Sequence, residues 1–257
     1  MPTVSPIRRA LLCAAFLCLG AVGVPAAAAD LYDAAVHHAG RSAADLKRDA
    51  TDRPAEVLRF AGIKPGMRVA DFLAAEGYYT EVLSYLVGPA GHVLMLNNAG
   101  YDHYSPGLTA RLAGGRLPNV EHRTVDLEKL DLPTASVDAL LVVKVYHDLY
   151  WVDPDGVWPK MNPKKVVAEM SRVLKPGGVL VLEDHAARQG SGSSAAQTLH
   201  RIDEDYARRE FESAGLRFVG SSNVLRKPED ARDQKAHEGP MLGKTDRFLL
   251  LFRKPSS

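Results

Sequence analysis

The sequence has very little cysteine. Cys13 and Cys18 are the two cysteines among 257 residues, and both lie inside residues 1–29. This stretch is typical of a secretory signal peptide, because two arginines precede a 15-residue apolar run, "ALLCAAFLCLGAVGV", and "PAAAAD" then offers small residues for cleavage. We therefore expect the rest of the chain to contain no disulfide, no thiolate nucleophile and no cysteine-ligated metal.

An excess of charge of one sign is also missing. Removing Arg8 and Arg9 from the 32 basic residues leaves 30 against 31 acidic residues, a formal net charge of −1. No basic tail or stripe points to nucleic acid, and no apolar run after residue 29 approaches the length of a membrane span. We expect a periplasmic protein that binds a small-molecule substrate, with no nucleic-acid partner and no membrane partner after signal cleavage. The oligomeric state is left open.

Strand and helix patterns alternate along most of the chain. Strands are expected at "RVADF", "HVLMLN", "VEHRTVD", "ALLVVKV", "VLVLED", "RFVGS" and "RFLLLF", with helices between them. Near-continuous apolar strands that alternate with helices predict a doubly wound α/β fold with a mainly parallel sheet. We divide the chain into the signal peptide at 1–29, an N-terminal helical segment at 30–62 and the α/β domain at 63–257.

Several stretches resemble one known family. "VADFLAAEGYYTEVLSYLVGPAGHV", "VEHRTVDLEKLDLPTASVDALLVV" and "VVAEMSRVLKPGGVLVLED" are similar, in order and spacing, to segments of class I S-adenosylmethionine-dependent methyltransferases. The resemblance covers about residues 52–255. A signal peptide combined with "YHDLYW" and "TLHRIDE" resembles an exported branch of predicted methyltransferases.

The resemblance implies a Rossmann-like methyltransferase sheet of seven strands in the order 3-2-1-4-5-7-6, with strand 7 antiparallel. It also implies S-adenosylmethionine as cofactor. The matching cofactor-binding positions follow the first three strands and are Asp71, Ala75, Gly77, Asn97, Asn98 and Asp126. In the family the end of strand 2 binds the ribose hydroxyls, here at Asn97 and Asn98, and Asp126 matches the residue that holds the adenine amino group.

The expected cofactor loop is short of glycine. The family pattern is roughly Gly-x-Gly-x-Gly, which falls on Leu73, Ala75 and Gly77. Glycine adopts a left-handed backbone freely, whereas alanine there costs roughly 1–2 kcal/mol. Two functions therefore remain open: a methyltransferase acting on a small molecule or envelope component, and a non-catalytic methyltransferase-fold binding protein. A nicotinamide-dependent oxidoreductase ranks third, because its G-x-G-x-x-G fingerprint is missing.

Titratable side chains gather after strands 4 and 5, at the sheet edge where ligands bind in such folds. His147 and His185 are candidate general bases with Asp148 or Asp184 as an orienting carboxylate, because methyl transfer needs a nucleophile whose proton is removed. The candidate substrate contacts are Tyr146, Asp184, His200 and Arg201. The structural alternative is that these histidines cap strand ends or bond to the backbone.

The same residues raise a metal alternative, because two histidines and a carboxylate on adjacent strand ends can hold Zn or Fe. No H-x-x-x-H or H-x-H spacing supports it, so we expect no metal site. Trp151 and Trp158 either line an apolar substrate pocket or pack as a loop. The polar connection Ser222–Asp246 is expected to act as a mobile lid or a substrate-gripping loop, since long loops in compact domains are often functional. The alternative is a passive surface excursion.

Overall fold

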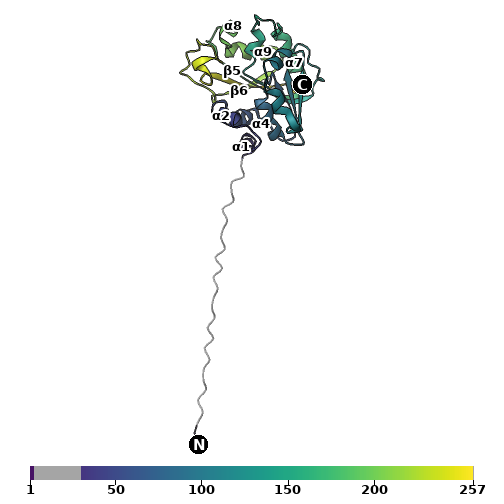
Figure 1. The fold of residues 1–257 in the computed structure, drawn as a ribbon, viewed down its shortest axis with the longest axis vertical. Helices are drawn as coiled ribbons and strands as arrows, with labels where there is room; N and C mark the ends of the chain where they lie inside the picture. Colours follow the sequence, from purple (N-terminus) through teal and green to yellow (C-terminus); the bar gives the residue numbers. More distant parts are fainter. Residues whose placement is uncertain (3–29, 257) are drawn as a thin grey trace.

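The computed structural model of this chain describes residues 1–2 and 30–256 (Figure 1). The predicted signal peptide, apart from its first two residues, therefore lies outside the described residues. None of the helices in the described part of the chain is long and apolar enough to cross a membrane.

A seven-stranded sheet forms the centre of the molecule. Its strands are β1 (Arg68–Phe72), β2 (His92–Asn97), β3 (Val120–Thr124), β4 (Val137–Val143), β5 (Leu174–His185), β6 (Arg217–Ser222) and β7 (Arg247–Arg253). Their order is β3-β2-β1-β4-β5-β7-β6, with β7 antiparallel to both of its neighbours and the other pairs parallel. The predicted fold class and strand order are confirmed.

Helices cover both faces of the sheet (Figure 1). The helices are α1 (Leu31–Val36), α2 (Ala43–Asp52), α3 (Pro54–Ala61), α4 (Tyr78–Val87), α5 (Ala99–His103), α6 (Leu108–Leu112), α7 (Pro163–Val173), α8 (Ala196–Leu199) and α9 (Glu204–Ser213). Three short 3-10 turns are η1 (Ala113–Gly115), η2 (His147–Tyr150) and η3 (Gly239–Met241).

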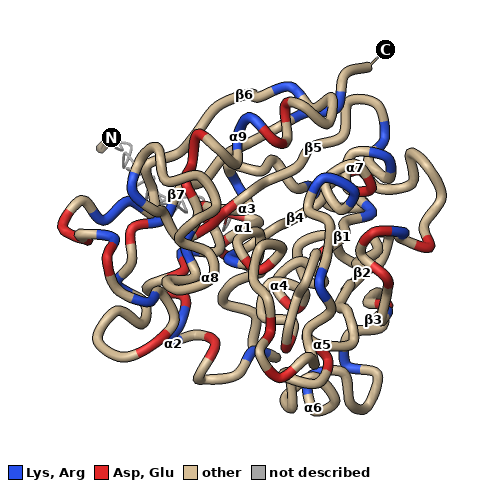
Figure 2. The backbone as a smooth tube through the Cα atoms, turned by 90° about the horizontal axis from the view of Figure 1, so that it is seen from above, with Lys and Arg blue, Asp and Glu red and all other residues tan. Residues whose placement is uncertain are grey.

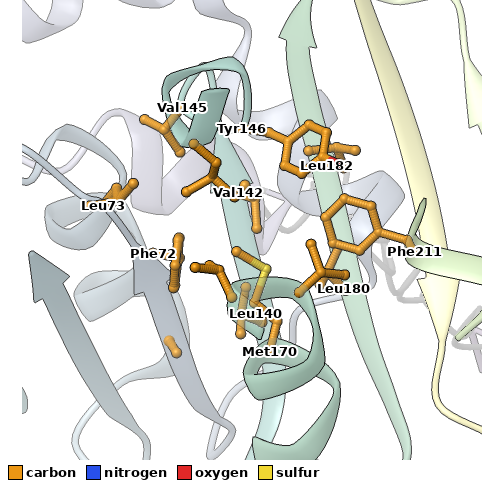
Figure 3. Packing of buried hydrophobic residues seen from close by; sticks show 14 of the residues in the cluster. Phe72, Leu73, Leu140, Val142, Val145, Tyr146, Met170, Leu180, Leu182 and Phe211 are labelled. Atoms are coloured by element: carbon orange, nitrogen blue, oxygen red, sulfur yellow. The ribbon is translucent and has the colours of Figure 1, made fainter. Parts of the chain in front are cut away.

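Strand side chains alternate between two apolar cores because successive residues point to opposite faces. On β1, Val69 belongs to the core that contains Val82 of α4, whereas Phe72 belongs to the core that contains Met170 of α7. Figure 3 shows this second core, with Phe72, Leu140 and Met170 close together between β1, β4 and α7. The two cores fix the strands and so fix the edge at which their carboxyl ends meet.

The N-terminal helices pack onto this domain. α1 lies against α3 and α4, and α3 lies against β5 and β7. α3 begins at Pro54, after a left-handed Arg53. The last residue of α2, Asp52, accepts hydrogen bonds from Lys144 at 2.7 Å and from Arg247 at 2.9 Å. Residues 30–62 therefore reach the edge where the parallel strands end.

Basic and acidic residues are interspersed around the molecule (Figure 2). Many of them are paired: Arg111 bridges Asp45 and Glu81, and Arg172 pairs with Glu169 at 2.7 Å. This mixing agrees with the near-zero net charge.

Candidate functional site

The backbone after β1 is left-handed at every second residue. The angle φ is 52° at Leu73, 52° at Ala75 and 80° at Gly77. These are the three positions where the family pattern has glycine, so the glycine-type conformation is kept although two of the residues carry a side chain. Each of these two costs roughly 1–2 kcal/mol, and strain of this kind gathers at ligand sites.

Asn97, at the end of β2, fastens this loop. Its Oδ1 accepts a hydrogen bond from the Ala75 N–H at 3.0 Å, and its Nδ2 donates to the Ala75 carbonyl at 3.0 Å and to Asp102 at 2.9 Å. The side chain is fully buried. This differs from the expected ribose contact, because both ends of the Asn97 amide are engaged within the protein.

Two further cofactor-binding candidates also have local roles. Asn98 is the N-cap of α5, and its Oδ1 accepts from the Tyr101 N–H at 2.8 Å. Asp126 is exposed, its Oδ1 accepts from the Glu128 N–H at 2.9 Å, and it lines neither of the two cavities described below. The structure therefore does not bring Asp126 to the site, in contrast to the adenine contact that the resemblance implies.

Asp71 lies at the carboxyl end of β1, next to the loop, and is almost completely buried. Its Oδ2 accepts a hydrogen bond from the Thr80 hydroxyl at 2.6 Å. Burial raises the pKa of Asp71 to about 6, against the opposing effect of the Thr80 hydrogen bonds. The carboxyl group is thus poised between its neutral and charged forms.

A cavity of about 400 Å³ lies against the loop. Its polar lining includes Asp45, Arg48, Asp71, Glu76, Tyr78 and Lys144. The Arg48 guanidinium, which pairs with Asp52, lies 3.9 Å from the centre of the Tyr78 ring at the start of α4. Glu76 is held by the Gly107 N–H at 3.0 Å. A cation beside a helix N-terminus suits an anionic ligand group and offsets the charge of Glu76.

A larger cavity, of about 890 Å³, adjoins the first. The residues that line both are Ala75, Tyr101, Tyr104, Ser105 and Lys144. The larger cavity is also lined by the histidine-rich group His147, Asp148, His185, His200 and His237. The structure thus brings all three predicted catalytic residues into one cavity, next to the loop.

His147 lies between two carboxylates. Its Nδ1 is 2.7 Å from Asp184 Oδ1 and its Nε2 is 3.1 Å from Asp148 Oδ1. Burial alone would lower the pKa of His147, but the charges of Asp148 and Asp184 outweigh burial and raise the pKa to about 10. Both ring nitrogens are engaged, so His147 is not placed to accept a proton from a ligand.

His185 differs from His147 in both its hydrogen-bond partner and the direction of its pKa shift. Its Nδ1 is 2.7 Å from the Thr245 hydroxyl, which precedes β7. Burial and the neighbouring charge of His147 hold the pKa of His185 well below 6.5. The imidazole is therefore neutral near pH 7, and its contact with Thr245 leaves Nε2 for a ligand in the cavity. Its orienting partner is thus a hydroxyl, where a carboxylate was expected.

His200 enters the cavity from the end of α8. It adopts a left-handed backbone, with φ of 50°. Its Nδ1 is 3.3 Å from Asp148 Oδ1, and its ring meets the His237 ring edge to face, with 4.1 Å between the ring centres. This predicted substrate contact does line the cavity.

The other three predicted substrate contacts are structural. The ring of Tyr146 is fully buried in a core and its hydroxyl donates to Glu210. The Arg201 guanidinium is fully buried and bonds Asp230 at 2.8 Å. Asp184 is fully buried and accepts from the backbone and ring of His147. These three expected substrate contacts line neither cavity. Asp184 instead lies where the other interpretation put it, as a carboxylate that orients His147.

Aromatic residues and the β6–β7 connection form the rest of the wall of the larger cavity. Trp151 and Trp158 both line the larger cavity, which favours the pocket interpretation over a packed loop. The connection contributes Lys235, Ala236, His237, Glu238, Leu242, Gly243 and Thr245. A buried ion pair anchors it to the segment after α8, where Arg201 pairs with Asp230 of the connection at 2.8 Å. A connection that lines the cavity and has fixed partners agrees better with a substrate-gripping loop than with a mobile lid.

Sequence reasoning missed several lining residues. Tyr101 donates its hydroxyl to Asp148 Oδ2 at 2.8 Å, and Thr245 contacts His185. Lys144, which was not among the predicted site residues, lies at the junction of both cavities, and its Nζ donates a hydrogen bond to Asp52. Tyr101 follows the carboxyl end of β2, so its position gave a signal; Thr245 is placed by the antiparallel pairing of β7.

Comparison with known proteins agrees with this architecture. Residues 76–182 match a family model described as a methyltransferase domain. The ubiquinone/menaquinone biosynthesis C-methyltransferase UbiE of Pseudomonas fluorescens (strain Pf0-1) is 32% identical over 127 residues, 49% of this chain and 45% of that protein. The same enzyme of Teredinibacter turnerae is 27% identical over 143 residues, 56% and 53% respectively. The chain spans about half the length of these curated relatives.

A crystal structure of a SAM-dependent methyltransferase from Aquifex aeolicus shares the fold, with a TM-score of 0.56 and 22% identity over 81% of this chain and 97% of that one. The family match over residues 76–182 and the strand order together support a methyltransferase domain of the class I S-adenosylmethionine-dependent type. S-adenosylmethionine is accordingly its cofactor. Membership of the exported branch stays a prediction.

Proposed function

We propose that this protein transfers the methyl group of S-adenosylmethionine to a small molecule held in the larger cavity. The observation that carries the proposal is the junction between the cavities, where Ala75, Tyr101 and Lys144 line both. The strained loop is on one side of this junction and the histidine-rich group is on the other. A donor site and an acceptor site that adjoin in this way are what a group transfer requires.

The smaller cavity has the chemistry to hold the cofactor. Asp71 offers a carboxylate for the amino group of the methionine part, and Arg48 offers a guanidinium for its carboxylate. The left-handed backbone at Leu73 and Ala75 keeps the glycine-type path of the loop despite the two side chains. When bound, S-adenosylmethionine supplies an electrophilic methyl group.

In the larger cavity His185 is the group best arranged to take a proton from the acceptor. Thr245 holds its Nδ1, which fixes the ring and leaves Nε2 for the ligand. His147 has both nitrogens on carboxylates and therefore orients Asp148. Trp151 and Trp158 form an apolar part of the wall, so we expect a small molecule with an apolar or aromatic portion and one polar group that carries the exchangeable proton.

The location outside the cytoplasm is part of the proposal and rests on the signal-peptide pattern of residues 1–29. A small molecule or a component of the cell envelope is then the acceptor. Intact-mass measurement of the protein from a periplasmic extract should give an N-terminus at or within a few residues of Asp30. Recovery from the membrane fraction with Met1 attached would contradict export.

Calorimetry with S-adenosylmethionine and S-adenosylhomocysteine tests cofactor binding. The informative variant is Gly77→Val, because a Cβ at Gly77 would lie 3.0 Å from Arg111 Cδ and 3.0 Å from Met95 Cε, at φ of 80°. Its matched control is Gly215→Val, where φ is 86° and a Cβ would meet nothing within 4 Å. Both variants carry the backbone strain, so loss of binding in Gly77→Val alone assigns the ligand to the loop.

Transfer itself is tested by incubating the protein with methyl-labelled S-adenosylmethionine and an envelope or small-molecule extract. We expect labelled product with the wild type and with Gly215→Val, and none with Gly77→Val. A protein that binds neither S-adenosylmethionine nor S-adenosylhomocysteine would overturn the proposal.

A further inference from the structure

Three potential metal ligands converge in the wall of the larger cavity. One ligand atom from each of His147, Asp148 and His200 lies within 4.8 Å of the others. Asp148 Oδ1 is the hub, at 3.1 Å from His147 Nε2 and 3.3 Å from His200 Nδ1. No other group of three His, Cys, Asp or Glu side chains within residues 1–2 and 30–256 meets this criterion.

These separations suit a shared cation. Nitrogen and oxygen ligands at about 2.0–2.2 Å from a zinc ion are themselves ~3–3.5 Å apart. Two of the three separations already fall in this range. The third separation, between the imidazole nitrogens of His147 and His200, is at most 4.8 Å. A small movement of one imidazole brings this separation into the same range.

Two of the three potential ligands, His147 and Asp148, also have hydrogen-bond partners that hold them in place. We call His147, Asp148 and His200 the triad. The second nitrogen of His147, Nδ1, lies 2.7 Å from the Asp184 carboxylate, which orients the ring and increases the basicity of Nε2. The second oxygen of Asp148 accepts the Tyr101 hydroxyl at 2.8 Å. Metal-ligating histidines and carboxylates commonly have such hydrogen-bonded partners.

Backbone strain at His200 and the charge around His147 also favour a bound cation. His200 is held in a left-handed conformation, which is costly for a residue with a side chain and is common where a side chain must be aimed at a ligand. Asp148 and Asp184 place two carboxylates around His147 in a buried setting. A divalent cation that displaces the Nε2 proton of His147 balances both of these charges.

We propose that His147, Asp148 and His200 bind one divalent first-row transition metal ion, of the Zn²⁺ or Fe²⁺ type. Two imidazoles and one carboxylate are a ligand set that these ions take, with further coordination positions open. Because the triad lines the cavity, an open position would face a ligand that offers an oxygen, nitrogen or sulfur donor. The site goes beyond the proposed methyl transfer, which needs no metal, and its test does not depend on that activity.

Residue spacing does not indicate this site, because two of its ligands are adjacent and the third is far along the chain. His147 and Asp148 lie in η2, whereas His200 follows α8. α8 packs against η2, and that contact creates the cluster.

Cobalt(II) is the probe, because its visible absorption reports both binding and ligand geometry. Protein purified without a histidine tag is dialysed against a chelator and titrated with CoCl₂. The test variant is His200→Gln, which changes a partly accessible side chain and should fold. The matched control is His92→Gln, because His92 pairs with Glu121 at 3.1 Å but belongs to no cluster of three among the described residues.

We expect the wild type and His92→Gln to bind one equivalent of Co²⁺ with a low-symmetry visible spectrum, and Zn²⁺ to displace it. Loss of a ligand in His200→Gln should weaken binding by ~10-fold or more. Asp184→Asn should weaken it less while leaving stoichiometry unchanged. Equal Co²⁺ affinity in wild type and His200→Gln, or no saturable binding by the wild type, would overturn the proposal.

Discussion

Asn97 and Ala75 are joined by two hydrogen bonds, each 3.0 Å long: the Asn97 amide accepts from the Ala75 N–H and donates to the Ala75 carbonyl. Ala75 carries the left-handed backbone that glycine takes in this family. The side chain at the end of β2 thus holds in place a conformation that Ala75 would avoid by itself. The loop keeps its shape through this contact, although its residue pattern looks degenerate.

The first prediction follows from that contact. Asn97→Ala should lower the free energy of unfolding by about 1–3 kcal/mol, because the N–H and carbonyl of Ala75 lose their partners. It should also weaken S-adenosylmethionine binding, as the loop is freed. Asn162→Asp is the control, since it keeps the oxygen that caps α7 and lies outside both cavities. Denaturant unfolding and calorimetry measure the two effects. An unchanged free energy of unfolding and an unchanged affinity in Asn97→Ala would show that the loop keeps its conformation without the Asn97 contact.

A second prediction separates strain from packing within the loop. Ala75→Gly removes roughly 1–2 kcal/mol of backbone strain but adds about 0.5–1 kcal/mol of unfolded-state entropy. It should therefore stabilise slightly or leave stability unchanged, with S-adenosylmethionine affinity equal or tighter. Leu73→Gly relieves the same strain but removes a side chain buried in the core shown in Figure 3. It should destabilise by about 2 kcal/mol or more.

Much of the fold could be predicted because the signals are local. The apolar runs predicted as the first, second and last strands match β1, β2 and β7 to within a residue. β5 is longer than "VLVLED", since it pairs with β4 already from Leu174. Strand boundaries depend on neighbours in space, and a single sequence does not show those neighbours.

The site was predicted less well, for the same reason. Position after a strand end was enough to find His147 and His185, because parallel strands end at one edge. It was not enough to separate Asp148, which lines the cavity, from Asp184, which lies behind it. The role of Arg201 depends on Asp230, in a connection whose path the sequence does not fix. Polar residues near a strand end thus face either a ligand or another buried charge.

A third prediction concerns pH. Burial raises the pKa of Asp71 to about 6 from its usual 3.8. A raised carboxyl pKa favours the protonated folded state, so this stabilisation is present below about pH 4 and is lost as pH rises through 6. Asp71→Asn stays neutral throughout. Relative to wild type, its unfolding free energy should therefore improve by up to about 3 kcal/mol between pH 4 and 7.5.

Urea unfolding of the two proteins at several pH values measures this difference. S-adenosylmethionine affinity should move in the opposite sense. The ionised Asp71 is the form that pairs with the amino group, so wild-type binding should strengthen above pH 6 and Asp71→Asn should not show that rise. A stability difference that is flat between pH 4 and 7.5 would mean that the carboxyl group keeps an ordinary pKa.

The last prediction concerns the connection between β6 and β7, residues 223–246. A polar segment of this length would be expected to tolerate change. In the structure, however, Asp230 binds both terminal nitrogens of the buried Arg201, at 2.8 and 3.2 Å. Asp230→Asn leaves a guanidinium buried without its counter-charge, which costs about 3–5 kcal/mol.

Asp233→Asn is the matched control, because Asp233 lies only three residues further along and pairs with Arg188 at 3.4 Å on the surface. That exposed pair contributes about 0–1 kcal/mol. Thermal melts should show a large drop for Asp230→Asn and almost none for Asp233→Asn. Equal melting temperatures would mean that the connection is not anchored through Arg201 and is free to move over the cavity.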